Sequence, residues 1–247
     1  NTINNLTTFE PKSKNKEVRK MKGKILVVML AVIALLVAGT ALADVISNSK
    51  HNLSSTSTGT VKALAGEQNG EICIWCHTPH GSNTAYTPLW NKQTAASTYT
   101  MYGNTIAGTA PDATPAGVSK ACLSCHDGVA GVNSLMNPAG SGGSPGLVLF
   151  NNSAAARTLT GAPNLGITLV DDHPVSMVYT ETTKASLKVK TTALTNWIGA
   201  STINGLLRGA SGNVECSSCH AVHDNANTLF MRVANTGSAL CLGCHAK

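Results

Sequence analysis

Towards its C-terminus the chain reads Val214-Glu215-Cys216-Ser217-Ser218-Cys219-His220-Ala221-Val222-His223. This segment holds two cysteines three positions apart, a histidine directly after the second cysteine, and another histidine three residues later. The Cys-x-x-Cys-His pattern occurs four times and uses all eight cysteines of the 247 residues. The other copies are Cys73-Ile74-Trp75-Cys76-His77, Cys122-Leu123-Ser124-Cys125-His126 and Cys241-Leu242-Gly243-Cys244-His245.

This spacing is typical of covalent c-type haem attachment. Two thiols three residues apart reach the two vinyl groups of one porphyrin, and the adjacent histidine is carried beneath the ring as an iron ligand. A zinc site needs two converging cysteine pairs and no histidine after each pair. Vicinal disulfides are the other alternative in an exported chain. We expect four haems, with the proximal ligands His77, His126, His220 and His245.

Four further histidines remain as candidate distal ligands, which are His51, His80, His173 and His223. Four haems need four distal ligands, so the count predicts bis-histidine coordination at every iron. Six-coordinate iron has no open position for a substrate, which favours electron transfer over catalysis. A methionine would be the competing axial ligand, and the candidates are Met101, Met136, Met177 and Met231.

Each candidate also has a plainer interpretation as a surface residue. His80 and His223 follow His77 and His220 by three positions, and residues at that spacing share one face of a helical turn. Neither can cross to the far side of its own haem, so as a ligand each would bind an adjacent haem. His173 follows Asp172, whose carboxylate could orient the imidazole ring. His51 lies on an arm rich in serine and threonine.

Residues 21–43 have the pattern of a secretory signal peptide: Lys22 and Lys24, an apolar run over residues 25–37, and a small-residue end at Ala41 and Ala43. The run is shorter than the roughly 20 residues that a spanning helix needs. A retained membrane anchor is the alternative. We expect residues 1–20 to be a non-native or disordered lead, residues 21–43 to be cleaved, and residues 44–247 to form a single haem-binding domain.

The net charge of +6 comes mostly from the first part of the chain, because residues 1–43 hold seven of the 18 basic and two of the 12 acidic side chains. The segment 44–247 is left with +1. It has no basic patch, which argues against nucleic-acid binding.

Aromatic residues make up only 4 % of the chain, so the porphyrins must supply much of the core. We expect mostly irregular coil with short helices and few strands, wrapped round a stacked haem chain. Short helices are predicted at 120–126 and 214–224, and a longer one at 193–207. Brief strands are predicted at 146–150, 167–170 and 186–189. Trp75, Trp90 and Trp197 are expected to pack on haem faces or edges.

Cys76-His77-Thr78-Pro79-His80, Asp172-His173-Pro174-Val175-Ser176 and the segments 214–223 and 240–245 resemble the doubled-CxxCH multihaem cytochromes of metal-reducing bacteria. With four motifs and no lipobox cysteine, the chain looks most like the outer-surface tetrahaem cytochrome E group, which polymerises into extracellular nanowires. That resemblance implies filaments that pass respiratory electrons to external acceptors such as metal oxides. It also implies redox partner proteins, and a distal histidine from the next subunit, for which His51 is the candidate. A soluble periplasmic shuttle and a multihaem reductase are the alternatives.

Overall fold

The computed structural model describes residues 46–86, 88–93, 97–103, 109–141, 146–148, 157–181 and 186–246. The chain divides into two units, Asn1–Asp44 and Val45–Lys247, and only the second contains described residues. The predictions for residues 1–20 and 21–43 therefore lie outside the described residues and stay predictions. In the described part, no helix has both the length and the apolar character needed to cross a bilayer.

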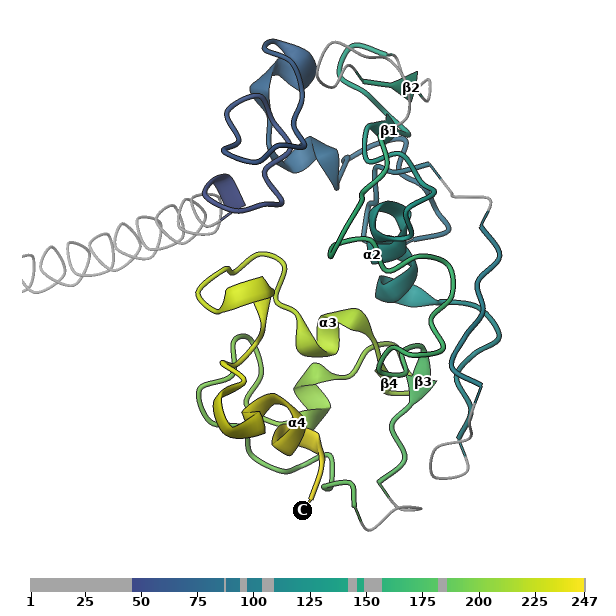
Figure 1. Cartoon of the computed structure of the whole chain (residues 1–247), viewed down its shortest axis with the longest axis vertical. Helices are drawn as coiled ribbons and strands as arrows, with labels where there is room; N and C mark the ends of the chain where they lie inside the picture. The colour runs from purple at the N-terminus through teal and green to yellow at the C-terminus, as the bar shows by residue number, and fades with distance from the viewer. Residues whose placement is uncertain are drawn as a thin grey trace, which may run out of the picture. The chain divides into compact units, whose positions relative to one another are not determined.

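Most of the described chain is coil, as the composition predicted (Figure 1). Its α-helices are α2 (Gly117–His126), α3 (Cys216–Cys219) and α4 (Ala239–Cys244), and each carries one of the cysteine motifs. The 3₁₀ helices are η1 (Glu67–Gly70), η2 (Cys73–Trp75), η4 (Ile203–Leu206), η5 (Thr228–Phe230) and η6 (Thr236–Ser238). The expected helix at 120–126 is confirmed within α2, whereas that at 214–224 is reduced to the single turn α3.

Two small antiparallel sheets join distant segments of the chain. Strand β1 (Ser134–Leu135) pairs with β2 (Gly146–Leu147) so that Ser134 faces Leu147. Strand β3 (Met177–Val178) pairs with β4 (Asn213–Val214) so that Met177 faces Val214. Of the predicted strands, 146–150 is confirmed at its start. The other two contain only isolated bridges, at Thr168 and Leu187.

The expected helix at 193–207 is wrong. Ala193 instead forms an antiparallel bridge with Thr202, and only η4 is helical. Asn196 and Gly199 both have positive φ angles, of 62° and 69°. Left-handed residues interrupt a right-handed helix, and glycine accepts that conformation without steric cost.

Buried asparagine side chains hold the long loops in place by hydrogen-bonding to their backbone groups. Asn133 is fully buried: its Nδ2 donates to the Val148 carbonyl at 2.8 Å, and its Oδ1 accepts the Arg157 amide at 2.9 Å. Asn52 binds within its own loop, donating to the Ser47 carbonyl at 2.8 Å. Buried backbone N–H and C=O groups must be hydrogen-bonded. These asparagine side chains supply partners for loop backbone groups that have none in a β-sheet.

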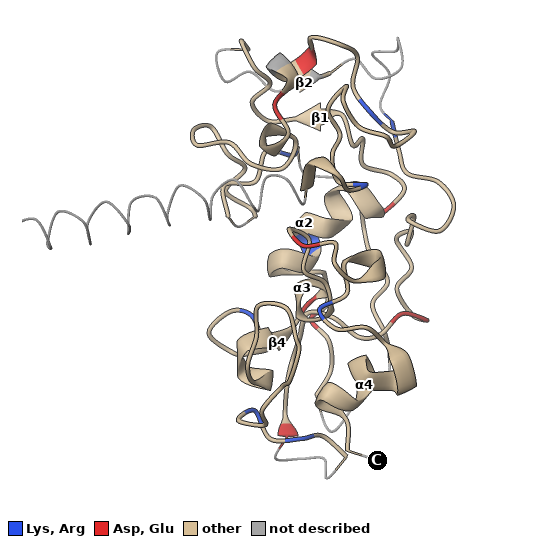
Figure 2. Ribbon diagram, turned by 90° about the vertical axis from the view of Figure 1, so that its left-hand side faces the viewer, with Lys and Arg blue, Asp and Glu red and all other residues tan. Residues whose placement is uncertain are grey.

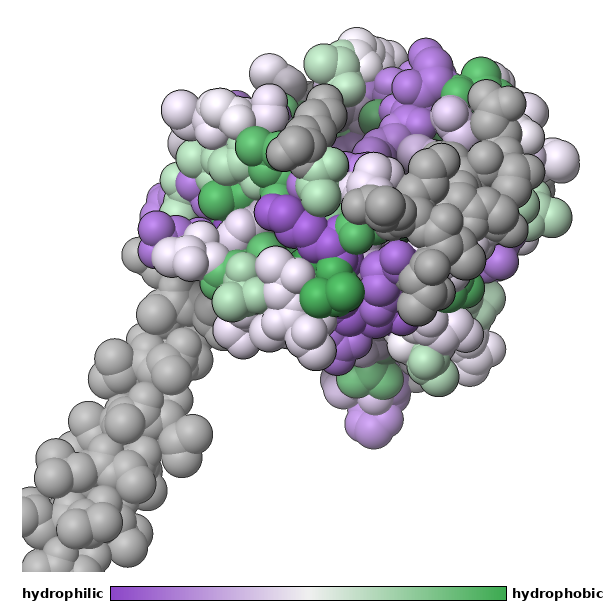
Figure 3. Space-filling view, turned by 90° about the horizontal axis from the view of Figure 1, so that it is seen from below, coloured by the Kyte–Doolittle hydropathy of each residue, from purple (hydrophilic) through white to green (hydrophobic). Residues whose placement is uncertain are grey.

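The apolar core is small, as the low aromatic content predicted. Its largest cluster consists of Ala63, Trp75, Val132, Leu135 and Val148. Trp75, which lies between the two cysteines of the first motif, is fully buried in this cluster. Several large apolar side chains remain exposed, and in Figure 3 apolar residues form small separate groups. Among the described residues, the basic and acidic positions are scattered along the ribbon (Figure 2).

Candidate haem sites

The first motif is folded into a helical turn and held by an antiparallel segment that follows it. The His77 amide donates to the Cys73 carbonyl at 2.9 Å, which brings both thiols and the histidine onto one turn. The Asn91 amide then donates to the Cys76 carbonyl at 2.8 Å, and Trp90 forms a bridge with His77. We call residues 88–91 the clamp of the first motif.

The third motif repeats this arrangement, contact by contact. The amide of His220 donates to Cys216 at 3.0 Å, the amide of Arg232 donates to Cys219 at 2.9 Å, and Met231 forms the bridge with His220. Leu89 and Phe230 occupy the same place in the two clamps, and both have positive φ angles, of 47° and 59°. The clamp of the third motif is therefore residues 229–232.

The fourth motif uses a clamp that precedes it in the chain, residues 186–188. The Lys188 amide donates to the Cys244 carbonyl at 2.8 Å, and Leu187 forms the bridge with His245. The second motif differs because α2 continues through His126. A separate loop lies against it there, and the Leu165 amide donates to the His126 carbonyl at 2.8 Å.

The imidazole rings of three motif histidines are oriented by backbone carbonyls. The Nδ1 atoms of His77, His126 and His220 lie 2.9, 2.7 and 2.9 Å from the carbonyl oxygens of Pro88, Pro163 and Leu229. A carbonyl oxygen only accepts, so Nδ1 carries the proton and Nε2 is left with a lone pair directed away from the clamp. This is the usual outer-shell arrangement of a metal-binding histidine.

Three of the motif histidines each face one of the four remaining histidines. The ring centres of His77 and His223 lie 6.1 Å apart. Those of His126 and His51 lie 6.2 Å apart, and those of His245 and His173 lie 6.4 Å apart. Two imidazoles on opposite sides of one metal ion have ring centres about 6.2 Å apart, if each metal–nitrogen bond is about 2.0 Å and each nitrogen lies about 1.1 Å from its ring centre. The donor sets therefore fit a bis-histidine iron.

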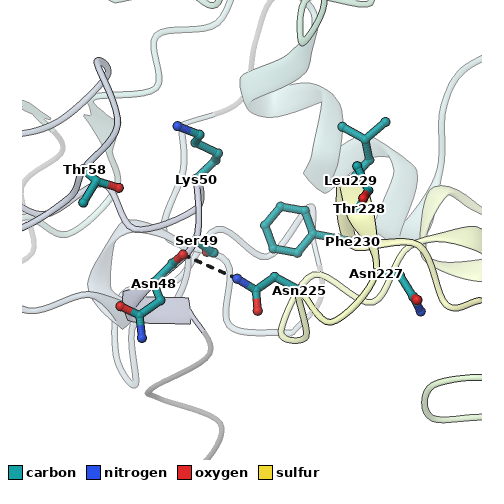
Figure 4. Close-up of a pocket in the computed structure, with 9 residues that line it drawn as sticks. All are labelled: Asn48, Ser49, Lys50, Thr58, Asn225, Asn227, Thr228, Leu229 and Phe230. Atoms are coloured by element: carbon teal, nitrogen blue, oxygen red, sulfur yellow. Dashed lines mark hydrogen bonds between the residues drawn. The ribbon is translucent and has the colours of Figure 1, made fainter. Parts of the chain in front are cut away.

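His51 is held against its own chain. Its ring stacks on Phe230 with the ring centres 4.4 Å apart. Figure 4 shows the adjoining contact, in which Asn225 Nδ2 donates to the Asn48 carbonyl at 3.4 Å. Burial, and then the neighbouring His126, lowers the pKa of His51 to about 4. The ring is thus neutral at physiological pH, as a metal ligand must be.

The structure does not bring His80 and His220 together in the same way. His80 is exposed, and its backbone carbonyl accepts hydrogen bonds from Thr78 Oγ1 at 2.7 Å and Asn137 Nδ2 at 3.0 Å. It lines a hollow of about 350 Å³ together with Cys73 and His77.

No two motif cysteines form a disulfide, and cysteines of different motifs lie close together. Cys122 and Cys216 hydrogen-bond to each other, which raises the pKa of Cys122. Helices α2 and α3 meet at this point, and Ser119 Oγ accepts the Cys216 amide at 3.0 Å. Burial, and then the Cys244 thiol, raises the pKa of Cys219 to about 11.

Several residues at these sites have no signal in the sequence. Asn91, Arg232 and Lys188 occupy corresponding places in three clamps, but they lie at different distances from their motifs. Trp90 was expected on a haem edge. Its ring is edge-on to His77, with the centres 5.5 Å apart, and its Nε1 donates to Ser124 Oγ at 2.9 Å, joining the first two motifs. Trp197 lies against Gly243 of the fourth motif.

Two thiols three residues apart, followed by an oriented imidazole, imply a covalent c-type haem site. Residues 209–247, which span the third and fourth motifs, match the family described as "Doubled CXXCH motif". The match supports a doubled-CXXCH multihaem cytochrome. No curated protein matches the chain.

Proposed function

We propose that the chain binds four c-type haems, each with two axial histidines, and passes electrons between them. Three pairs of histidines support this most directly, because their ring centres lie 6.1 to 6.4 Å apart. The pairs are His77 with His223, His126 with His51, and His245 with His173. Each pair joins a motif histidine to one outside the motif. Bound haem supplies a one-electron iron couple at each site.

The fourth pair follows from the correspondence between the first and third motifs. His223 comes three residues after His220 in the third motif, yet faces His77 of the first. His80 holds the same place after His77. We therefore assign His80 as the distal ligand of the third haem, so that the two motifs exchange ligands. His80 has a fixed backbone and an exposed side chain, which suits such a role.

The protein residues hold the haems close to one another and fix the ligand protons. His223 ties the first haem to the third motif, and the hydrogen bond from the Cys216 amide to Ser119 Oγ of α2 ties the second motif to the third. The carbonyls of Pro88, Pro163 and Leu229 keep the protons of His77, His126 and His220 on Nδ1, so electron transfer needs no proton movement at these three ligands.

The experiment is a haem count combined with spin-state spectroscopy of the protein matured with haem. Intact mass and alkaline pyridine spectra should give four haems per chain, and the ferric electron paramagnetic resonance spectrum should contain only low-spin signals. Fewer than four haems would contradict the proposal. A high-spin signal in the unaltered protein would indicate an open iron site and favour the multihaem reductase.

We also propose that the mature chain is exported and polymerises into an extracellular filament that carries electrons to external acceptors. Support comes from the signal-like segment 21–43 and the resemblance stated above. Electron microscopy of the secreted fraction tests it. Filaments are the expected result, whereas a monodisperse periplasmic protein would favour the soluble shuttle.

A distal histidine from the next subunit, with His51 as its source, was also expected. In the structure His51 faces His126 of its own chain. We therefore propose that His51 serves within its own subunit. The His51→Ala variant should then show a high-spin haem in dissociated monomers. An unchanged monomer spectrum would restore the intersubunit role.

A further inference from the structure

Two arginine side chains converge on the turn between the cysteines of the third motif. The Arg232 Nε donates to the Ser217 carbonyl at 2.8 Å, and the Arg208 Nη2 donates to the same oxygen at 3.2 Å. The Arg208 Nε also donates to Ser217 Oγ at 2.9 Å. Ser217 directly follows Cys216, so both guanidinium groups lie beside the turn whose cysteines would attach the third haem.

Both groups are bound by neutral acceptors. Arg232 is 9 % exposed, and its Nη1 donates to the Ile198 carbonyl at 2.6 Å. The Arg208 Nη1 donates to the carbonyls of Gly205 and Leu207, each at 3.0 Å. Among the described residues, the ion pair that forms is Lys190 with Glu181, on another part of the chain.

The positive charges persist because arginine stays protonated in proteins. Burial, and then the neighbouring Arg208, lowers the pKa of Arg232. The two guanidinium groups share the Ser217 carbonyl, and Arg232 is buried while Arg208 is half-buried, so both lie in a partly desolvated region. In such a region a charge is screened less than it is at the surface.

The corresponding clamp positions show what is particular to the third motif. In the first motif the neutral Asn91 donates from Nδ2 to the Ile74 carbonyl at 2.7 Å. In the fourth motif Lys188 donates from Nζ to the Leu242 carbonyl at 2.5 Å, in an exposed position. In each of these three motifs a clamp side chain donates to the carbonyl of the residue after the first cysteine. The donor is an amide in the first motif, an exposed ammonium in the fourth, and in the third a buried guanidinium joined by a second one.

We propose that Arg208 and Arg232 raise the reduction potential of the haem attached at Cys216 and Cys219, and thereby bias electrons towards this point of the haem chain. This inference rests on the proposed haem binding. Reduction adds one electron to the iron and lowers the charge of the haem by one. A fixed positive charge nearby stabilises the reduced form, because it repels ferric haem more than ferrous haem.

The test is a potentiometric titration of the matured protein, followed by haem absorbance and by paramagnetic nuclear magnetic resonance. Three variants are compared: Arg232→Gln and Arg208→Gln, which remove charge but can still donate, and Arg208→Lys, which keeps the charge. In each Gln variant, one of the four components should move to a more negative midpoint while the other three stay in place. Arg208→Lys should stay close to the unaltered protein.

Two results would overturn the inference. One is an unchanged set of midpoints in both Gln variants. The other is an equal shift in Arg208→Lys and Arg208→Gln, which would show that the geometry of the turn matters and its charge does not. Lys188→Met is the control for an exposed cation at a corresponding place, and its shift should be smaller. The haem count and low-spin signature of every variant report separately on the proposed function.

Discussion

His77 and His223 face each other with their ring centres 6.1 Å apart, although one belongs to the first motif and the other follows the third. Under the proposed ligation, the distal ligand of one haem would be carried by the segment that attaches another. Two haems held by one short segment cannot move apart independently. The proposed ligands would therefore also hold the haems in fixed positions relative to one another.

His223→Ala should leave one haem, that of the first motif, without a distal ligand. We expect a high-spin ferric signal corresponding to about one haem in four, with the haem count unchanged. The matched test repeats the substitution in a Cys73→Ala, Cys76→Ala background that lacks the first haem. There His223→Ala should add no high-spin signal. If the signal persisted in that background, another haem would be the partner of His223.

Asn91→Ala should destabilise the first haem site. The side chain donates to the Ile74 and Asn137 carbonyls at 2.7 and 3.2 Å and accepts the Asn137 amide at 2.8 Å, all in a buried region. Loss of these partners leaves buried backbone groups unpaired and should cost about 2–4 kcal/mol of unfolding free energy. Urea unfolding measures the loss. Asn225→Ala, at an exposed 3.4 Å contact, is the control and should change stability by less than about 0.5 kcal/mol.

Gly243→Ala should destabilise the fourth motif, because a methyl group there would overlap the ring of Trp197. Overpacking of this kind costs about 1–3 kcal/mol. Thermal unfolding followed by haem absorbance measures it. Gly103→Ala is the matched control, since a methyl group at Gly103 meets open space. Adding Trp197→Leu should recover part of the loss, and a Gly243→Ala protein as stable as the control would contradict the contact.

Glu215→Gln should alter how stability depends on pH. Burial raises the pKa of Glu215 above 4.5, despite hydrogen bonds from Ser119 and Ser176. A raised carboxyl pKa means that folding favours the protonated acid. The ionised Glu215 therefore lowers the free energy of unfolding. This loss is absent below the unfolded-state pKa and grows as the pH rises through the folded-state pKa.

The Glu215→Gln substitution should therefore raise the free energy of unfolding more at pH 7 than at pH 4, as measured by urea midpoints. The glutamine side chain can still accept the Ser218 amide at the start of α3. Glu181→Gln, which removes a partly exposed carboxylate, controls for the general loss of a negative charge. A gain that is equal at both pH values would contradict the expected effect.

The motifs and the coil-rich fold could be predicted because both depend on local features. Four Cys-x-x-Cys-His segments need only a single helical turn each, and scarce aromatic residues cannot build a large core. The helix expected at 193–207 was wrong because two left-handed residues, Asn196 and Gly199, break it. Helical propensity does not reveal such residues when a tertiary contact requires them.

The clamps could not be predicted either. Residues 88–91, 229–232 and 186–188 do the same work at different distances from their motifs, and one precedes its motif. No constant spacing in the sequence relates the clamps to their motifs. They resemble one another only in their backbone hydrogen bonds.

The sequence by itself determined the chemistry of the attachment sites, because two thiols and a histidine act within five consecutive residues. It also determined the supply of candidate ligands, since four histidines remain for four motifs. Only the tertiary structure decided which histidine faces which, that Arg208 and Arg232 meet at Ser217, and that His51 lies against its own chain. These relations join residues far apart along the chain, and they depend on how the loops pack.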